Sequence, residues 1–447
     1  MNQQAPKPFR VVVVGGGIAG LTMSHCLQKA GIDHVVLEAH SQVAAPIGAS
    51  IGFWPHGMRV LDQLGCGEDM LRRSDAMVES HCRMPNGKAL SSTTLWDYIQ
   101  TRHGYEFRSM ERRLALEIMY ENLPEKSKVL TGKKVTNVVE TQNGVRVTLA
   151  DGSYEEGDIV VGCDGVRSMV REKIWQMADR LAPNLISHRE KNSMRVEYTC
   201  IIGVSTPIPA LNSTSDMHVT YGQGRTFQIV TQPDCTCFLI YQKLETPLTG
   251  AAALSGTKFT QQDADNAAAK LSSCALTEDV TFGELYKQRI RSQLVNLEEV
   301  VFDHWHFGRM VMLGDAAHKV TPNFAFGGNT AIEGAATLCN QLVKSLDASA
   351  IRPLSQSIIS AVFQGYQEQH KKRVKKIFTA SYYFTRMQAW DNVIMRFVAK
   401  WIAPWMGDNL VADYTATLVV PGSKLDYVAV PGHVKGTRAF DDEVSGA

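Results

Sequence analysis

The hydrophobic pattern opens with a strand-like run, "RVVVV", that passes directly into three glycines and then into a helical pattern. The helical stretch "LTMSHCLQKAG" ends at Gly31, and a second apolar run, "HVVLE", ends at Glu38. A strand, a glycine turn, a helix and a second strand within residues 10–40 predict a βαβ unit. Further along, "GMRVLDQLG" and "SMERRLALEIMYENL" place apolar residues at helical spacing and predict two more helices.

The pattern then changes to the period of two that is typical of strands. Between residues 128 and 163, the pairs Asn143-Gly144 and Asp151-Gly152 separate short apolar runs and predict hairpins. The runs "MRVEYTCIIGVS", "MHVTYGQGRTFQIVTQ" and "CTCFLIYQKL" predict strands of a second, mostly antiparallel sheet. At "RMVMLGDAAH" a strand of the parallel type returns, and a long helix is expected from about Asn329 to Leu346.

Composition places the chain among ordinary globular proteins and limits its partners. Of its 447 residues 44% are hydrophobic and 20% are charged, and this length suggests two or three domains. The formal net charge of +1 gives no basis for a nucleic-acid partner. The nine cysteines form no CxxC pair, which predicts neither a disulfide framework nor a metal site and fits a reducing cytosol. Cys235 and Cys237 share one side of a strand and are interpreted as core residues.

Membrane-spanning segments are not predicted. No stretch reaches the ~18 to 20 uninterrupted apolar residues of a membrane helix, and the polar N-terminus does not resemble a secretory signal. The nearest candidate, "VIMRFVAKWIAPWMG" (residues 393–407), is interrupted by Arg396, Lys400 and Pro404. We interpret it as an amphipathic helix packed on the protein, with peripheral contact to a membrane surface as the alternative. We therefore expect a soluble, cytoplasmic monomer or weak dimer.

The first motif with chemical meaning is the GxGxxG formed by Gly15, Gly17 and Gly20 between the first strand and the first helix. Its glycines allow a tight turn, close approach to a pyrophosphate and close packing of helix on strand, and the helix N-terminus favours phosphate. Glu38 follows Gly20 by 18 residues, near the spacing at which a carboxylate accepts from ribose hydroxyls. This motif predicts a dinucleotide but leaves NAD and FAD as alternatives.

Two later stretches place further candidate groups at strand ends. The first, "VVGCDGVRSMVR", ends a strand at Asp164-Gly165, which taken alone fits a simple turn. The second places Asp315 after a buried strand, followed by Pro322 and by Gly327-Gly328 at the start of a helix. An aspartate in this position can accept from a polyol such as a ribityl chain. A helix N-terminus stabilises the negative charge of a reduced flavin.

In the order GxGxxG, DGxxSxxR and GDAAHxxxP, the sequence resembles the FAD-dependent group A monooxygenases of the aromatic-hydroxylase type over nearly its whole length. The stretches "IGASIGFWPHGMRVLDQLG", "MERRLALEIMYENL" and "GSKLDYVAVPGH" resemble the fungal secondary-metabolism branch, and paxilline-type epoxidases are the nearest in pattern. The resemblance implies reduction of FAD by NADPH and reaction with O2 to a flavin C4a-hydroperoxide. One oxygen atom is then transferred to an electron-rich alkene, indole or arene of an apolar small molecule.

The resemblance also implies cofactor-binding residues, which are Gly15, Gly17, Gly20, Glu38, Gly48, Gly52, Arg113, Asp164, Gly165, Asp315, Pro322, Gly327, Gly328 and Asn329. In that family Glu38 would hold the adenosine ribose, Arg113 the pyrophosphate region and Asp315 the ribityl chain. Asp164 with Gly165 would contact both FAD and NADPH. Pro322 would lie beside the flavin edge at which oxygen reacts.

Several residues remain open between a functional and a structural role. Tyr221, and more weakly Arg195, are candidate catalytic groups near the substrate, although a structural tyrosine on a half-buried strand is the stronger interpretation. His318 is interpreted as structural, and the run "HKKRVKK" (residues 370–376) as one solvated helix face. The run Phe324-Ala325-Phe326 departs from the family, which usually has a glycine and a polar residue before the Gly-Gly pair.

We therefore predict an α/β fold in which a Rossmann-type FAD-binding domain is interleaved with a mostly antiparallel substrate domain and followed by C-terminal helices. The expected boundaries are 1–174 for FAD binding, 175–300 for the substrate sheet, 301–347 for the return to the first domain, and 348–447 for the helical region. Two alternatives to a monooxygenase are a flavin-dependent dehydrogenase or oxidase on the same fold, and a non-catalytic carrier of the GDP-dissociation-inhibitor type.

Overall fold

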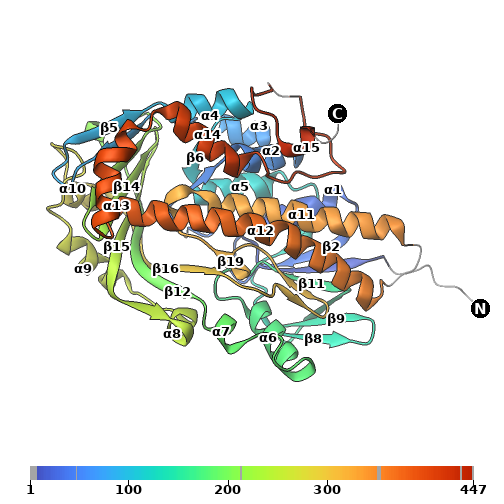
Figure 1. Cartoon of the computed structure of the whole chain (residues 1–447). Helices are drawn as coiled ribbons and strands as arrows, with labels where there is room; N and C mark the ends of the chain where they lie inside the picture. The colour runs from blue at the N-terminus through green and yellow to red at the C-terminus, as the bar shows by residue number, and fades with distance from the viewer. Residues whose placement is uncertain (1–7, 47, 212–213, 350–353, 433–434, 445–447) are drawn as a thin grey trace, which may run out of the picture.

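The computed structural model describes residues 8–46, 48–211, 214–349, 354–432 and 435–444 (Figure 1). A six-stranded sheet has the order β17-β18-β11-β1-β2-β7. Its strands are β1 (Arg10–Val14), β2 (Asp33–Leu37), β7 (Val129–Leu130), β11 (Ile159–Gly162), β17 (His306–Phe307) and β18 (Met310–Met312). The central strand β1 pairs in parallel with β2 and β11. Val11, Val12 and Val13 are fully buried, as expected for a parallel strand covered on both faces.

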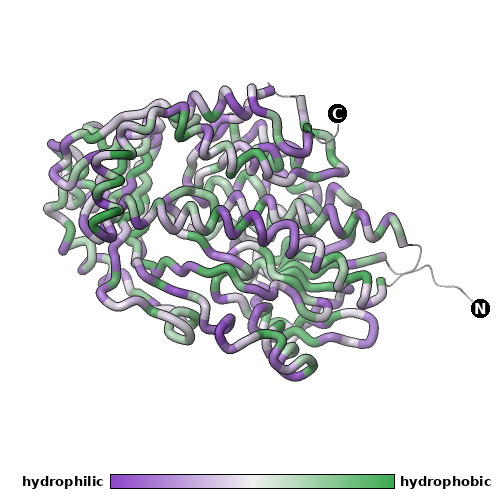
Figure 2. Tube along the Cα trace, viewed as in Figure 1, coloured by the Kyte–Doolittle hydropathy of each residue, from purple (hydrophilic) through white to green (hydrophobic). Residues whose placement is uncertain are grey.

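Helices and a smaller sheet cover this central sheet. Helix α1 (Ile18–Lys29) packs against α11 (Phe326–Ala348), and α12 (Gln356–Gln388) packs in turn on α11. The three-stranded antiparallel sheet β8 (Val135–Thr141), β9 (Gly144–Leu149) and β10 (Tyr154–Gly157) and helix α6 (Met169–Leu181) share the same hydrophobic core. Figure 2 shows the strongly hydrophobic strands of the central sheet enclosed by more polar segments. The predicted βαβ unit and both hairpins are confirmed.

The second large sheet has eight strands in the order β19-β16-β12-β15-β14-β13-β4-β5. Its strands are β4 (Ser80–Arg83), β5 (Ala89–Thr93), β12 (Arg195–Ser205), β13 (Met217–Gly222), β14 (Arg225–Thr231), β15 (Thr236–Thr249), β16 (Arg289–Val301) and β19 (His318–Lys319). All neighbours pair antiparallel except β13 and β4. In Figure 1 this sheet lies to the left and the six-stranded sheet to the right, and α12 extends along both. The predicted α/β fold class is confirmed.

The remaining elements connect the sheets and complete the C-terminal region. They are β3 (Ser50–Phe53), β6 (Arg108–Glu111), α2 (Pro55–Gln63), α3 (Gly67–Arg72), α4 (Leu95–His103), α5 (Arg112–Glu121), α7 (His188–Lys191), α8 (Gly250–Ser255), α9 (Gln261–Lys270), α10 (Phe282–Lys287), α13 (Val393–Phe397), α14 (Asp408–Val419) and α15 (Asp441–Val444). Between α13 and α14 the chain forms a π-helical turn, Val398–Ile402, and a 3-10 turn, Ala403–Trp405. Among the described residues, none of the helices combines the length and hydropathy needed to cross a bilayer.

The structure differs from the sequence pattern in three places. Helix α11 begins at Phe326, so the Gly327-Gly328 pair lies within its first turn instead of before it. The residues before β16 contain α8, α9 and α10. Helices α8 and α10 have six residues each, and α9 has only alanines as apolar residues, so none of them shows a clear helical period. Helices α9 and α10 begin with capping boxes at Thr260 and Thr281. The boundary expected at residue 174 falls inside α6, which is continuous from its cap at Ser168.

The basic run in α12 is not one solvated face, because Arg373 points inward to a buried carboxylate. Arg373 forms an ion pair with Glu333 of α11, and its other end donates to the Leu418 carbonyl at 2.6 Å. His370 and His56 approach the same carboxylate at 3.7 and 3.9 Å. Burial opposes ionisation of Glu333, but the charge of Arg373 outweighs burial and holds the pKa of that carboxyl well below its usual range. Lys372, Lys375 and Lys376 remain exposed.

Candidate cofactor and substrate cavity

A cavity of about 810 Å³ lies between the two large sheets, within the size range of cofactor and ligand sites. Three of its lining residues, Gly17, Cys163 and Asp315, follow the carboxyl ends of β1, β11 and β18. Ligands of open α/β sheets bind at this edge, because the loops after parallel strands converge there. The opposite wall comes from the eight-stranded sheet and includes Ile202, Met217, Gln228, Val230, Leu239 and residues 293–298.

The glycine turn after β1 has the geometry that phosphate binding requires. Gly15 has φ +102°, and a Cβ there would lie 2.4 Å from the Cys163 carbonyl oxygen. A Cβ on Gly20 would lie 1.8 Å from the Gly15 carbonyl oxygen, so neither position accepts a side chain. Gly17 is the N-cap residue of α1 and lines the cavity. The N–H groups of a first helical turn have no partner within the helix and are available to an anion.

Glu38, which directly follows β2, stabilises this turn through a hydrogen bond. One carboxylate oxygen accepts from the Gly16 N–H at 2.6 Å, and the other accepts from the His40 N–H at 2.8 Å. The residue is 8% exposed, so its charge lies close beside the glycine turn. Because a carboxylate has about four acceptor positions, Glu38 can also accept from a ligand hydroxyl.

Arg112, and not Arg113, reaches the cavity from the start of α5. A Cβ added at Gly48 would lie 3.1 Å from Arg112 Cδ, and one added at Gly17 would lie 3.6 Å from its Nη2. Burial lowers the pKa of Arg112, and Asp315 and Glu38 oppose this shift. The Arg113 side chain is 43% exposed and pairs with Glu111 and Glu117. Neighbouring helical residues point about 100° apart, so only one of these arginines can face the cavity.

Asp164 forms hydrogen bonds with the residues at the start of α6. Its carboxylate accepts from Ser168 Oγ at 2.5 Å and from the Val170 N–H at 3.0 Å, and burial raises its pKa. The neighbouring Gly165, with φ +76°, lines the cavity, whereas Asp164 is absent from the lining. The structure thus gives Asp164 a helix-capping role in addition to the cofactor contact that the resemblance implies.

Asp315 lies in the 3-10 turn after β18 and forms an ion pair with Lys319 across the cavity wall. Burial alone would lower the pKa of Lys319, but Asp315 outweighs burial and raises it above its ordinary value. Glu298 of β16 faces the same region, and burial raises its pKa. Arg167 lies 3.4 Å from the Glu298 carboxylate. Sequence reasoning missed Lys319, Glu298 and Arg167, because the strands β19 and β16 and the loop before α6 that carry them meet only in the folded chain.

The start of α11 offers a second set of backbone donors. Gly327, Gly328 and Pro322 line the cavity, and the first turn of α11 leaves its N–H groups without helical partners. Asn329 is fully buried; its amide donates to the carbonyls of Gly52 and Ala325 at 2.9 and 2.7 Å. It also accepts from the Trp54 N–H at 3.0 Å. Asn329 therefore fastens the start of α11 to β3 and is not part of the lining.

The run that departs from the family pattern contains a strained residue. Ala325 has φ +54°, a left-handed conformation that costs a non-glycine residue roughly 1–2 kcal/mol. Phe326 is fully buried and stacks on Trp54 at 5.1 Å between ring centroids, while Phe324 packs on Phe384 at 4.9 Å. Only Ala325 of the three lines the cavity. Where the family usually has a polar residue, this chain thus has aromatic side chains that pack in the core behind the cavity wall.

The wall from the eight-stranded sheet is mainly apolar but contains buried amides. Asn296 of β16 is 7% exposed, and neither its amide nitrogen nor its amide oxygen has a hydrogen-bond partner. Gln228 of β14 accepts from Tyr241 Oη at 3.0 Å. A buried, unpaired amide is unfavourable, so Asn296 is a candidate for binding a polar group of a ligand.

The two candidate catalytic residues lie outside this lining. Tyr221 is 5% exposed and its hydroxyl donates to Cys82 Sγ at 3.3 Å; burial raises the pKa of Tyr221 well above its usual value. Arg195 is an exposed residue at the start of β12, opposite Glu299 of β16. The structure therefore supports the structural interpretation of Tyr221 and gives neither residue a contact with the cavity.

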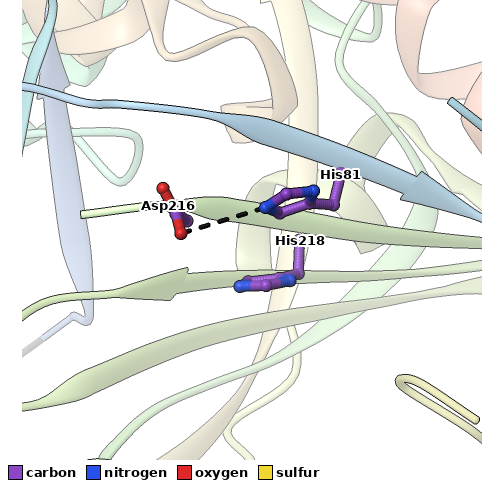
Figure 3. Close-up of side chains that lie close together, drawn as sticks. All are labelled: His81, Asp216 and His218. Carbon is purple, nitrogen blue, oxygen red and sulfur yellow. Dashed lines mark ion pairs between the residues drawn. The ribbon is translucent and has the colours of Figure 1, made fainter. Parts of the chain in front are cut away.

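Outside the cavity, three side chains that could bind a metal ion lie close together (Figure 3). They are His81 of β4, His218 of β13, and Asp216, which directly precedes β13. The two rings stack at 4.9 Å, and His81 Nε2 lies 3.9 Å from the Asp216 carboxylate. Arg83 donates to His218 Nδ1 at 2.9 Å, which places the proton of the neutral ring on Nε2. A protonated Nε2 cannot coordinate a cation, and the nearby guanidinium repels one. The cluster is therefore poorly suited to a metal ion.

Comparison with known proteins identifies the family. A family model described as an FAD binding domain matches residues 9–180 and 260–358, more than half of the chain. The FAD-dependent monooxygenase DEP2 of Fusarium langsethiae is 38% identical over 94% of this chain and 80% of its own length. The FAD-dependent monooxygenase penE of Penicillium thymicola is 36% identical over 96% of this chain and 89% of its own length.

Solved structures share the fold. Klebsiella pneumoniae HpxO complexed with FAD and uric acid superposes with a TM-score of 0.73 at 20% identity, covering 94% of this chain and 99% of that one. Pseudomonas aeruginosa PqsL in complex with 2-aminobenzoylacetate gives a TM-score of 0.63 at 19% identity, covering 85% and 96%. The matched domain model and the extensive identity to fungal enzymes show that the chain belongs to the fungal group A branch of the FAD-dependent monooxygenases, as its three motifs indicated.

Proposed function

We propose that this flavin monooxygenase uses NADPH and O2 to place one oxygen atom on an electron-rich alkene, indole or arene of an apolar secondary metabolite. The observation that carries the proposal is the single cavity that joins the glycine turn and the start of α11 to an apolar sheet wall. In the balanced reaction, substrate, O2, NADPH and a proton give the oxygenated product, NADP⁺ and water. The bound FAD supplies the redox chemistry, and the protein supplies position and a dry site.

The residues at the cavity fit an extended FAD. We assign the phosphates to the first turn of α1 and to Arg112, and the adenosine ribose to Glu38. Asp315 would accept from the ribityl hydroxyls. The N–H groups of Gly327 and Gly328 would donate to the pyrimidine edge of the flavin, where negative charge accumulates on reduction.

The remaining assignments keep the family roles where the structure allows them. Gly15 and Gly20 shape the glycine turn, Gly48 and Gly52 line the cleft, and Pro322 would lie beside the flavin. Lys319 would balance Asp315 and the charge of the cofactor. The positions of Asp164 and Asn329 favour indirect roles in cofactor binding. Asp164 would act by holding the start of α6, and Asn329 by holding the start of α11.

Replacing Arg112 with methionine is expected to weaken FAD binding about ten- to hundredfold, because a charge-assisted contact to phosphate is lost. The matched variant Arg113→Met removes only a partly exposed ion pair and should change FAD affinity by less than about twofold. Both affinities can be measured by titrating the deflavinated protein with FAD and following flavin fluorescence. Loss of FAD in Arg113→Met, with Arg112→Met unaffected, would contradict the assignment and support the role implied by the family resemblance.

Asn296→Leu should raise the melting temperature and weaken substrate binding by about ten- to hundredfold, because the variant removes both an unpaired amide and a polar contact. The matched control is Asn323→Leu, since the Asn323 side chain is also buried but its amide donates to Gln388 at 2.7 Å. That control should lower the melting temperature. Thermal unfolding and substrate titration by flavin absorbance report the two effects. A lower melting temperature in Asn296→Leu would show that its amide has an unseen partner.

The proposed reaction is tested by supplying NADPH and candidate prenylated indoles, terpenoids and arenes under ¹⁸O2. A product that contains one ¹⁸O atom, together with substrate-stimulated NADPH oxidation, is expected. A product that has lost two hydrogens, with hydrogen peroxide and no incorporated oxygen, would establish the alternative of a dehydrogenase or oxidase. Purified protein that binds no FAD would favour the non-catalytic carrier.

A further inference from the structure

The segment between α12 and α14 presents large apolar side chains to the outside. Val393 is 84% exposed, Ile394 is 70% exposed and Trp405 is 83% exposed. Phe397, Trp401 and Ile402 are also exposed, so six large hydrophobic residues lie outward within residues 393–405. Scattered single hydrophobic residues are normal on a protein surface, but a contiguous group of this kind marks an interaction site. We call residues 393–407 the docking segment.

One small residue, Ala399, attaches the docking segment to the rest of the protein. Ala399 is fully buried and packs with Trp390, Val219 and Tyr221 on the eight-stranded sheet. The segment thus buries an alanine and leaves two tryptophans outside, which is the reverse of the packing expected for an amphipathic helix that serves only the protein core. In Figure 1, α13 lies at the end of the molecule away from the six-stranded sheet, and Figure 2 shows strongly hydrophobic residues in it.

The charges of the docking segment select the kind of partner. It contains no aspartate or glutamate, and its two charged residues are Arg396 and Lys400. The Lys400 ammonium lies 5.6 Å from the Trp401 ring and 5.9 Å from the Trp390 ring, so its charged end stays at the level of the aromatic rings. Tryptophans and basic residues at one level are typical of segments that lie in the boundary between lipid headgroups and acyl chains.

We infer that the docking segment binds the surface of a lipid bilayer that contains anionic lipids, with its apolar side chains inserted and its bases at the headgroups. Docking in the interface suits a chain in which no described helix is able to span a bilayer. Leu410 and Tyr414 on α14 and Tyr383 on α12 are also exposed. This inference stands independently of the proposed reaction.

The docking segment also lies close to the substrate side of the cavity. Met217 packs against the cluster that holds Ala399 and also lines the cavity. A docked bilayer would therefore lie on the same side of the molecule as this part of the apolar wall. Apolar substrates partition into lipid, so docking would raise their concentration where the cavity lies.

The test is co-sedimentation of the full-length, FAD-loaded protein with vesicles of phosphatidylcholine alone and with added phosphatidylserine. Two basic residues near the surface should give about thirty-fold tighter binding to the anionic vesicles. The double variant Trp401→Ser/Trp405→Ser should bind both vesicles at least about tenfold more weakly. Arg396→Gln/Lys400→Gln should lose the preference for phosphatidylserine and retain binding that depends on the tryptophans.

A matched control is Tyr154→Ser/Leu181→Ser, which removes two exposed hydrophobic residues from other parts of the chain. It should bind vesicles like the unaltered protein, and all variants should keep their bound flavin and melting temperature. Equal loss of binding in this control would overturn the inference. Failure of the unaltered protein to bind either vesicle would also overturn it, as would a dimer in analytical ultracentrifugation that the tryptophan variant abolishes without any vesicle binding.

Discussion

Arg373→Met is expected to lower the free energy of unfolding by about 3–5 kcal/mol, because it leaves the Glu333 carboxylate buried without its cation. Glu333 is 1% exposed, so water cannot replace the lost partner. The nearby His56 does not compensate, since burial lowers its pKa to about 3 and keeps it neutral near pH 7. Urea unfolding at pH 7, followed by far-ultraviolet circular dichroism, measures the change.

The pH dependence of this variant provides a second readout with a definite sign. In the unaltered protein the folded pKa of Glu333 is depressed, so its contribution is present above the ordinary carboxyl pKa and is lost as the pH falls. Without Arg373, burial raises that pKa and the carboxyl takes up a proton more readily. The stability difference between the two proteins should therefore narrow toward pH 4.

Lys372→Met is the matched control for the arginine variant, because Lys372 is the preceding residue on the same helix and is exposed. It should change the unfolding free energy by less than about 0.5 kcal/mol. The double variant Arg373→Met/Glu333→Leu should recover much of the loss, since it removes the unpaired charge as well. An Arg373→Met protein as stable as the control would show that water enters the site and solvates Glu333.

Gly15→Ala is expected to reduce FAD affinity at least about a hundredfold, or to give protein that purifies without flavin. The added Cβ would lie 2.4 Å from the Cys163 carbonyl oxygen in a backbone with φ +102°, so β1 and β11 must separate next to the phosphate turn. The ratio of flavin to protein absorbance after purification measures the effect.

Gly31→Ala is the control for this variant. Gly31 ends α1 at φ +65°, and nothing lies within 4 Å of a Cβ built there. It should lose only about 1 kcal/mol of stability and retain flavin, because its strain is local and far from the turn. If both variants bind FAD normally, the glycine turn does not hold the phosphates.

Patterns that depend on local geometry could be predicted from the sequence. A GxGxxG between strand and helix leaves few backbone arrangements, and the close contacts of Gly15 and Gly20 follow from that turn. The hairpins at Asn143-Gly144 and Asp151-Gly152 follow from turn preferences in the same way. By contrast, α8 and α10 have only six residues each, and the apolar residues of α9 are all alanines, so none of the three gives a clear period. The capping boxes of α9 and α10 were local signals for two of these helices.

Side-chain direction was the main feature that the sequence left open. Two adjacent arginines begin α5, and family resemblance favoured Arg113, but the rotation of the helix directs Arg112 toward Gly17 and Gly48. Within "HKKRVKK", no local feature distinguishes Arg373 from its neighbours. Only the packing of α12 on α11 brings it to Glu333.

By itself, the sequence determined the class of fold, the dinucleotide turn and the family, because each of the three motifs depends on residues within its own strand and the turn or helix that follows. The tertiary structure decided which residues share the cavity, that Tyr221 is a core residue, and which side of the docking segment is buried. A helical period shows that a segment has two faces, but the neighbours that cover one face come from distant parts of the chain. In residues 393–407 those neighbours cover Ala399 and leave the tryptophans outside.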